Sequence, residues 1–287
     1  MQLRLRRIAM LAVLSALSTM TLAQTPASCT FTFFDFGGPG GPEPSGINRW
    51  GNVVGNSGVG PFIRYSDGRI QSLSFGFVGK RNRNGTTVGE FSTTDNHTHG
   101  FIENGNQRVT IDFPGATHTG LRGINAYGSV VGNASAPGSF AVAIEIKNGK
   151  TIVLPFGMNT SAAPQAISDA GLIVGIHEVP DPGVPNAVVD HGFVFANGQF
   201  MDFAFPGALG TTANDVNAQG QIVGDFGGGT AGVGNYIYSG GKFFTVKLPG
   251  NNGGTLTGIN GFGTITGAIY QNSAPTSRGF VGNCTLP

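Results

Sequence analysis

The sequence predicts an all-β protein, a six-bladed β-propeller of four-stranded antiparallel blades whose ring is closed by the N-terminal strand pairing with the C-terminal blade. The main observation is a ten-residue motif that recurs along the chain and ends in a glycine. These closing glycines are separated by 34, 43, 43, 49 and 43 residues, a period typical of propeller blades rather than of helical solenoids. They are Gly55, Gly89, Gly132, Gly175, Gly224 and Gly267.

Residues 1–23 have the composition of a signal peptide. Arg4, Arg6 and Arg7 precede an apolar run over residues 8–22, and Thr21-Leu22-Ala23 supplies a small-residue cleavage site. We therefore expect a single propeller domain over residues 24–287 in an extracellular or periplasmic location. No other stretch approaches the length of a membrane-spanning segment, so we expect no transmembrane anchor.

The composition favours strands and argues against two other classes of protein. The 49 glycines and the low share of charged residues, 11%, favour short strands joined by tight turns. The 22 phenylalanines supply enough apolar surface to argue against disorder. Removal of the signal peptide leaves 13 basic and 15 acidic residues, so we expect no nucleic-acid partner.

Each repeat contains four short apolar segments separated by turn signals, which is the pattern of a four-stranded blade. In the repeat over residues 211–249 the segments are 211–216, 221–225, 235–238 and 242–248, here called strands A to D. The turn between strands A and B follows the pattern N-x-x-G. Asparagine accepts hydrogen bonds from the backbone of its own turn, and glycine adopts the left-handed conformation.

The strands of one repeat differ in their apolar pattern. Strand B carries adjacent apolar residues such as Ile222 and Val223, which predicts an inner strand covered on both faces, and the glycine after them predicts the close approach of another backbone. Strand D alternates, with Phe244, Val246 and Leu248 on one face, which predicts a half-exposed outer strand. Further C and D strands are predicted at 99–102 and 107–113, at 142–146 and 151–154, and at 191–194 and 199–205.

The two ends of the chain carry complementary parts of a blade. Residues 29–36 form a D strand with no C strand before it, and residues 278–284 form a C strand with no D strand after it. Pairing them would remove an exposed edge. Cys29 and Cys284, the only cysteines, would then lie together, and we expect a disulfide because an exported chain with an even cysteine count favours one. Two unrelated free thiols are the alternative.

Two repeats carry a His-Gly-Phe triplet, at His99-Gly100-Phe101 and His191-Gly192-Phe193. With the G-I-N-x-x-G-x-V-V-G motif and the downstream Asp112-Phe113-Pro114-Gly115, the sequence resembles the HAF-type extracellular repeats, a bacterial family named for a His-Ala-Phe triplet. The resemblance covers nearly the whole predicted mature chain, although Asn235 and Arg278 replace the histidine in later blades. It implies an extracellular repeat protein and assigns no activity.

The loops between strands B and C vary in length, whereas the other turns within a blade are tight and nearly constant. Variable loops on a rigid scaffold commonly carry binding sites, so we expect any ligand on this loop face, with neutral loop drift as the alternative. No spacing matches a structural zinc site, and we expect neither a metal nor a cofactor. The candidate ligand-binding residues are Asp95, His97, His99, His177, Glu178, Asp181, Asp190 and His191.

Trp50, Tyr127 and Phe262 occupy the same place in the A-to-B turn, two residues after the asparagine. They would stand on the tight-turn face, opposite the loop face. Stacking on a sugar or peptide is one interpretation, and cover of the neighbouring turn is the other. Solvated charges of outer strands are expected near the ends of D strands, at Asp35, Asp112 and Asp202.

These features favour a monomeric binding or structural module for an extracellular partner, a glycan or a protein, without catalytic residues. No G-x-S-x-G motif, phosphate-binding loop or Cys/His nucleophile pair is present. The alternative is an extracellular hydrolase or lyase that acts on polysaccharide with paired carboxylates on the loop face. For that enzyme, the candidate catalytic acids are Glu90, Asp95, Glu178, Asp181, Asp190 and Asp225. Self-assembly in the cell envelope is a third interpretation.

Overall fold

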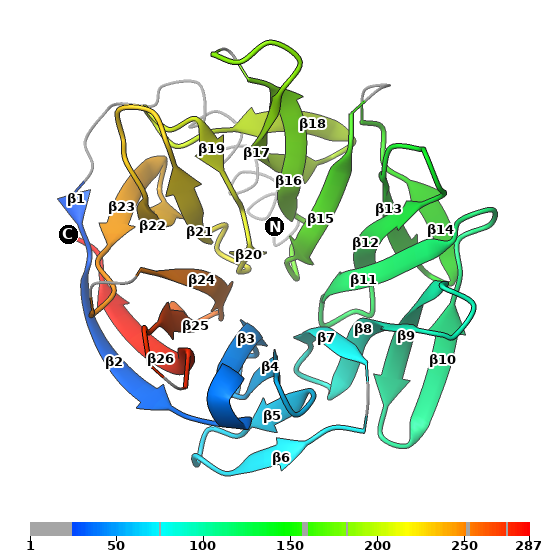
Figure 1. Cartoon of the computed structure of the whole chain (residues 1–287), viewed down its shortest axis with the longest axis horizontal. Helices are drawn as coiled ribbons and strands as arrows, with labels where there is room; N and C mark the ends of the chain where they lie inside the picture. Colours follow the sequence, from blue (N-terminus) through cyan, green and yellow to red (C-terminus); the bar gives the residue numbers. More distant parts are fainter. Residues whose placement is uncertain (1–24, 75, 157–159, 182, 251–252, 274) are drawn as a thin grey trace, which may run out of the picture.

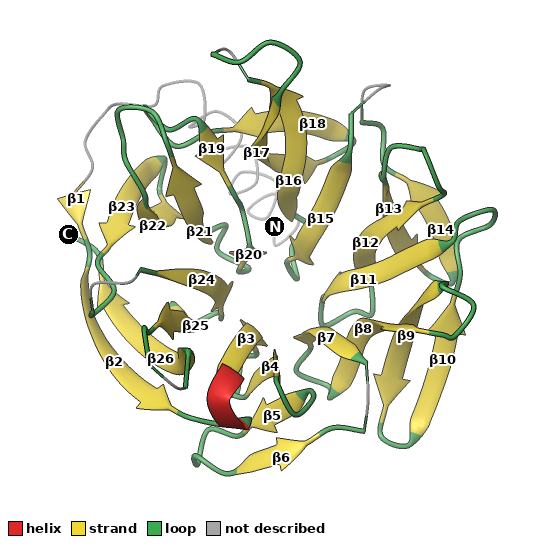
Figure 2. Cartoon of the chain, viewed as in Figure 1, coloured by secondary structure: helices red, strands yellow, loops and turns green. Residues whose placement is uncertain are grey.

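The computed structural model describes residues 25–74, 76–156, 160–181, 183–250, 253–273 and 275–287. In this part of the chain, small antiparallel sheets stand around a common axis in a propeller-like arrangement (Figure 1). Strands dominate (Figure 2), and within the described residues the one helix is the 3₁₀ turn η1 (Gly38–Gly40). None of these residues forms a helix with the length and apolar composition that crossing a membrane requires. The predicted signal peptide, residues 1–23, lies outside the described residues.

Three sheets have four strands each, as predicted. The first contains β3 (Pro42–Ile47), β4 (Val53–Ser57), β5 (Phe62–Arg64) and β6 (Ile70–Ser72). The second contains β15 (Ala162–Ile167), β16 (Ile173–Pro180), β17 (Val188–Ala196) and β18 (Gln199–Phe203). The third contains β24 (Gly254–Ile259), β25 (Thr264–Tyr270), β26 (Ser277–Thr285) and the N-terminal β2 (Ser28–Phe34).

One sheet of eight strands departs from the prediction of six separate four-stranded blades. It spans two repeats, because the short connection after β10 brings Thr117 and His118 beside Thr98. The Thr98 N–H donates to the Thr117 carbonyl at 2.9 Å, and His118 pairs with Thr98 in parallel orientation. The strands are β7 (Phe77–Arg81), β8 (Thr86–Ser92), β9 (Thr98–Asn104), β10 (Gln107–Ile111), β11 (His118–Ile124), β12 (Val130–Ser135), β13 (Val142–Lys147) and β14 (Lys150–Val153).

The remaining sheet has six strands. Its predicted strand A is divided into two short strands, and the N-terminal β1 adds a parallel strand beside β23. The hydrogen bonds therefore define five sheets in the described chain rather than six. The strands are β1 (Thr25–Pro26), β19 (Gly210–Thr211), β20 (Asp215–Val216), β21 (Ile222–Gly227), β22 (Gly234–Ser239) and β23 (Lys242–Val246).

The first and last long strands lie side by side. β2 pairs antiparallel with β26, and Cys29 lies opposite Cys284 in this pair. The predicted disulfide between the two cysteines is confirmed, with a Cα–Cα distance of 4.1 Å. At the other end of the pair, Arg278 makes two hydrogen bonds to the carboxylate of Asp35. The edge of β26 is therefore covered by the chain's own N-terminal strand.

Apolar side chains are buried between neighbouring repeats. Both Ile222 and Val223 are fully buried, as predicted for strand B. The prediction of a half-exposed strand D is wrong for β23, where Phe243 and Phe244 are both buried. The reason is that Phe243 packs on Phe203 of the preceding repeat, with ring centres 5.2 Å apart.

The closing glycine of each repeat packs against the backbone of strand A, as predicted. A Cβ atom at Gly175 would overlap the carbonyl oxygen of Ala163 and the ring of Phe193. Beside this contact the register of strands A and B shifts between Pro164 and Ala166. Such a bulge bends a strand and re-aims the residues that follow it, and in each repeat those residues form the turn at the axis.

Candidate functional site

The turns between strands A and B surround the axis and share one design. In the turns that begin with asparagine, Oδ1 accepts two backbone N–H groups. Asn125, for example, accepts from Tyr127 and Ser129 at 3.0 and 2.9 Å. The glycine at the fourth position has the predicted positive φ, 81° at Gly128. The side-chain amide nitrogen is left free to bond outside the turn.

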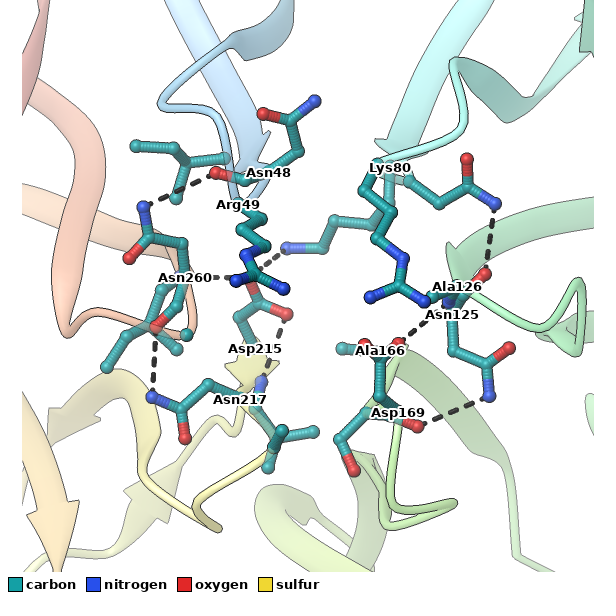
Figure 3. A pocket seen from close by; sticks show the side chains of 18 of the residues that line it. Asn48, Arg49, Lys80, Asn125, Ala126, Ala166, Asp169, Asp215, Asn217 and Asn260 are labelled. Atoms are coloured by element: carbon teal, nitrogen blue, oxygen red, sulfur yellow. Dashed lines mark hydrogen bonds and ion pairs between the residues drawn. The ribbon is translucent and has the colours of Figure 1, made fainter.

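That amide nitrogen connects neighbouring repeats. Nδ2 of Asn82 donates to the carbonyl oxygen of Asn125 at 3.0 Å, and Asn217 donates to Asn260 at 3.0 Å. Asn260 donates in turn to the carbonyl oxygen of Asn48 at 3.3 Å, across a sequence separation of 212 residues (Figure 3). The N-x-x-G pattern explains the turn itself but does not reveal this second bond, which fixes the turns relative to one another.

Strand A contributes one residue per repeat to the axis, nine residues before the closing glycine. In two repeats this residue is charged. Lys80 Nζ lies 3.2 Å from Asp215 Oδ2 (Figure 3). Lys80 Nζ also donates to the Thr257 carbonyl at 2.6 Å, and Asp215 Oδ2 accepts the Ile259 N–H at 2.9 Å. The remaining repeats carry small residues that leave room for these two side chains: Gly46, Gly123, Ala166 and Gly258.

The ion pair is nearly withdrawn from solvent, with 12% of the Lys80 side chain and 11% of the Asp215 side chain exposed. Burial lowers the pKa of Lys80 and raises the pKa of Asp215, while the charge of each partner opposes the shift of the other. Either charge alone would be buried without compensation. The two residues therefore depend on each other.

The recognisable part of the second motif begins only at Arg81, so the motif by itself does not include Lys80. A signal does exist in the sequence. Counting back nine residues from Gly89 and Gly224 places Lys80 and Asp215 at a position otherwise occupied by glycine or alanine. Opposite charges at such a position identify the pair.

A hollow of about 320 Å³ adjoins the ion pair on the tight-turn face, room for about ten water molecules at roughly 30 Å³ each. Arg49 points toward its middle (Figure 3). The guanidinium carbon lies 5.9 Å from the centre of the Trp50 ring and 5.7 Å from the centre of the Phe262 ring. Such distances allow cation–π attraction, which orients Arg49 over the opening.

This hollow carries unbalanced positive charge. Of its two acids, Asp215 is paired with Lys80, and Asp169 accepts the Ala126 N–H at 2.7 Å. Among the described residues, no carboxylate lies within ion-pair distance of Arg49 or Arg83, which also line the hollow. Two guanidinium groups are therefore available to an anionic ligand.

The aromatic residues of the tight turns remain largely exposed, with 61% of Trp50, 68% of Tyr127 and 73% of Phe262 accessible. Trp50 also contacts the neighbouring turn, because its Nε1–H donates to the Arg83 carbonyl at 3.3 Å. One edge of the Trp50 ring thus covers the adjacent turn, while the exposed ring surfaces are free to stack on a ligand.

A second hollow, of about 370 Å³, lies on the loop-face side of Lys80. Glu43, Arg122 and Asp225 contribute to its lining. Burial raises the pKa of Asp225 to about 6, although hydrogen bonds from the Leu256 N–H and the Asn214 amide favour the charged carboxylate. This mouth therefore holds an acid that titrates close to neutral pH.

The predicted loop residues Asp95, His97 and His99 lie close together. Asp95 accepts the His97 N–H at 3.2 Å, and the two imidazole centres are 6.2 Å apart. Hydrogen bonds from the Thr93 hydroxyl and the His97 N–H lower the pKa of Asp95. His99, however, bonds through Nδ1 to Asp112 at 2.7 Å rather than to Asp95.

The predicted residues His177 and His191 lie opposite each other in β16 and β17. His177 is therefore a strand residue rather than part of a loop between strands B and C, and His191 belongs to strand C, as predicted. Both bond to Asp202, His177 through Nε2 at 2.8 Å and His191 through Nδ1 at 3.1 Å. Burial acts to raise the pKa of Asp202, but the two histidines outweigh it and the pKa is lowered. The cluster borders an open hollow of about 560 Å³.

The acids near the ends of strands D, predicted to be solvated charges of outer strands, also bind side chains of the neighbouring strands. Asp112 and Asp202 hold histidines of strand C, and Asp35 holds Arg278. These carboxylates are half exposed but each has a partner in its own sheet. In these three repeats, an acid near the end of strand D binds the residue at the first position of the His-Gly-Phe triplet, which is His99, His191 or Arg278.

The register of strands B and C also corrects the prediction that Asn235 replaces the histidine of the triplet. Tyr236 lies opposite Gly224 in the same way as Phe193 lies opposite Gly175. Gly234, rather than Asn235, therefore occupies the place of His191.

Among the described residues, no side-chain hydrogen bond joins the predicted residues Glu178, Asp181 and Asp190 to the histidine cluster. Glu178 and Asp190 are register partners, and Asp181 accepts the Gly183 N–H at 2.7 Å. Within the described part of the chain, no three His, Cys, Asp or Glu side chains are arranged to hold a metal ion.

No family model matches the sequence, and no curated protein sequence matches it. Among solved structures, TolB from Acinetobacter baumannii is 12% identical, with a TM-score of 0.48 over 84% of this chain and 63% of that chain. A Pyrococcus horikoshii acylaminoacyl peptidase is 9% identical, with a TM-score of 0.44 over 77% of this chain and 36% of that one. Aleuria aurantia lectin in complex with α-methyl-L-fucoside is 11% identical, with a TM-score of 0.49 over 91% and 94% of the two chains. The propeller-like arrangement follows from the strand pairing of this chain itself.

Proposed function

We propose that the protein is an extracellular or periplasmic binding module, a six-bladed propeller whose ligand, a glycan or a protein, lies on the tight-turn face. Arg49 carries the proposal, because its guanidinium group lies beside two exposed aromatic rings and has no carboxylate partner among the described residues. Aromatic and arginine side chains are the residues that most often dominate binding surfaces.

Six blades are supported by the six closing glycines and by the form of the eight-stranded sheet. Both of its halves repeat the bulge of strand A, between Val78 and Arg81 and between Leu121 and Gly123. The pairing of β2 with β26 and the bond from Asn260 to Asn48 support a closed ring. A kinship with the HAF-type repeats remains part of this proposal.

An exported location is supported by the Cys29–Cys284 disulfide, because disulfides persist in oxidising compartments. The signal peptide over residues 1–23 belongs to the same proposal. Mass spectrometry of the secreted protein tests it, since cleavage after Ala23 would make Gln24 the first residue.

The experiment for the binding function is a screen of the mature protein against an oligosaccharide array and against extracellular proteins. Each ligand found is then tested with Phe262→Ala and with Phe140→Ala, which removes another half-exposed ring away from the tight turns. Loss of binding in Phe262→Ala alone supports the proposal. Equal affinities for the two variants place the ligand elsewhere, and the predicted loop residues Asp95 and His191 are then substituted in turn.

The second candidate is a hydrolase or lyase that acts on polysaccharide at the loop-face hollow. The observation that favours it is the raised pKa of Asp225, since a general acid works best when its pKa is near the working pH. Glu43 lines the same hollow and would be its partner. Release of reducing ends by the wild-type protein, abolished in Asp225→Asn, would favour this candidate over a binding module.

A further inference from the structure

The hollow on the tight-turn face combines uncompensated arginines with open aromatic rings. From this combination we infer that its ligand is an acidic glycan, with a sugar carboxylate bound between Arg49 and Arg83 and the sugar ring lying against the exposed aromatic residues. The inference rests on the proposed binding function and specifies the class of ligand.

The first argument is charge. Arg49 and Arg83 belong to consecutive repeats and line one hollow, and neither has a carboxylate within ion-pair distance among the described residues. The one other acid at this mouth, Asp169, is held by the Ala126 N–H. A carboxylate is the anion whose planar geometry matches the guanidinium group in paired hydrogen bonds.

The second argument is that the two arginines are tied to one rigid rim. Arg49 lies beside the rings of Trp50 and Phe262, and Trp50 donates to the Arg83 carbonyl. In the same turns the side chains of Asn82 and Asn260 make three hydrogen bonds each, and the side chain of Asn48 accepts two. Little conformational freedom is lost when a ligand binds to groups that are already oriented.

The third argument concerns the rest of the ligand. Phe262 lines the hollow and Trp50 lies beside Arg49, with 73% and 61% of their surfaces exposed, and such rings offer flat apolar surfaces. A sugar presents C–H groups on one face and polar groups at its edge, so one molecule suits both kinds of protein group. The size of the hollow, about 320 Å³, lies within the roughly 300–1,000 Å³ range of small-ligand pockets.

The test uses short oligomers of uronic acids, galacturonic and glucuronic, and their fully methyl-esterified forms as matched neutral ligands. Isothermal calorimetry on the full-length mature protein should give at least tenfold tighter binding of the free acid. Arg49→Gln and Arg83→Gln should each weaken binding of the acid at least tenfold. Arg69→Gln, an exposed arginine beside Asp67 outside the hollow, is the control and should change the affinity less than twofold.

Salt provides an independent readout, because screening weakens exposed charge pairs. Affinity for the acid should fall as sodium chloride is raised from 50 to 300 mM, and binding of a neutral ester should not. Equal binding of acid and ester, binding unchanged in both arginine variants, or no binding of either form would overturn the inference. A neutral sugar that binds in a Phe262-dependent way would overturn it while leaving the proposed binding function in place.

Discussion

Lys80 Nζ lies 3.2 Å from Asp215 Oδ2, and the two residues hold the same position in their repeats, nine residues before Gly89 and Gly224. The other four repeats have glycine or alanine at this position, so the ion pair at the axis replaces two small residues. Lys80 lines both hollows and Asp215 lines the one on the tight-turn face, so the pair bears on both stability and the shape of the ligand site.

Removal of Lys80 should be more harmful than removal of both charges. Lys80→Met leaves the Asp215 carboxylate buried without its partner, which typically costs about 3–5 kcal/mol. The double variant Lys80→Met/Asp215→Asn should recover a large part of that loss in urea unfolding. A double variant less stable than Lys80→Met would show that Asp215 does not depend on Lys80.

Asp225 should make stability fall as pH rises from about 4 to 6. Burial raises the pKa of Asp225 to about 6, from about 3.9 for an unperturbed aspartate, so the native state binds more protons than the unfolded state in this window. By linkage this acid costs roughly 3 kcal/mol of stability above pH 6. The free energy of unfolding of Asp225→Asn, measured against wild type from pH 4 to pH 7, should therefore rise relative to wild type. A constant difference would contradict the raised pKa.

Reduction of the Cys29–Cys284 disulfide should destabilise the protein strongly. The bridge spans 255 residues, and the chain-entropy account assigns about 5 kcal/mol to closing such a loop. Calorimetry with and without reductant should show a large fall in Tm. The variant Cys29→Ser/Cys284→Ser should match the reduced protein and be indifferent to reductant, and an unchanged Tm would mean that strand pairing alone holds the ends.

Asn125 should tolerate serine better than alanine. Its side chain accepts two backbone N–H groups and donates to the Ser168 carbonyl at 3.3 Å. Alanine removes all three bonds at a buried site, at a cost of about 2–4 kcal/mol. Serine keeps an acceptor, as Ser168 does for Leu172, so Asn125→Ser should lose clearly less in chemical denaturation. Equal losses would mean that acceptance within the turn contributes nothing.

Gly175 should not accept a methyl group. The added Cβ would overlap the Ala163 carbonyl and the Phe193 ring, so Gly175→Ala should cost roughly 3 kcal/mol in unfolding experiments. Gly261→Ala is the matched control, because a Cβ there meets nothing within 4 Å and should change stability by less than about 1 kcal/mol. Similar stabilities of the two variants would argue against the close approach of strand A.

The sequence predicts those features of the fold that depend on the repeated motif and on local turn chemistry. The closing glycines and the N-x-x-G turns follow from recurring residues at fixed spacing, and the pairing of Cys29 with Cys284 follows from the complementary strands at the two ends of the chain. The number of hydrogen-bonded sheets did not, because one parallel pair between His118 and Thr98 joins two repeats. Nothing in a local pattern marks such a contact.

The candidate sites were harder to predict, because they depend on side chains brought together around the axis. Asp202 and His177 are 25 residues apart in the chain, and the histidines of strand C find acids on strand D at unequal offsets. Arg49 and Arg83 stand in turns where the neighbouring repeats carry alanine, aspartate or glycine, so no recurring residue drew attention to them. Their significance depends on the absence of a partner, which only a three-dimensional structure can establish.

Trp50 is the only tryptophan in the chain, and its ring borders Arg49 on the tight-turn face. Its fluorescence therefore reports directly on the central claim, that the ligand binds on this face. Titration with a ligand identified by calorimetry should change the Trp50 emission with the same Kd as the heat signal. A ligand that saturates the protein in the calorimeter while the Trp50 spectrum stays unchanged would contradict the account.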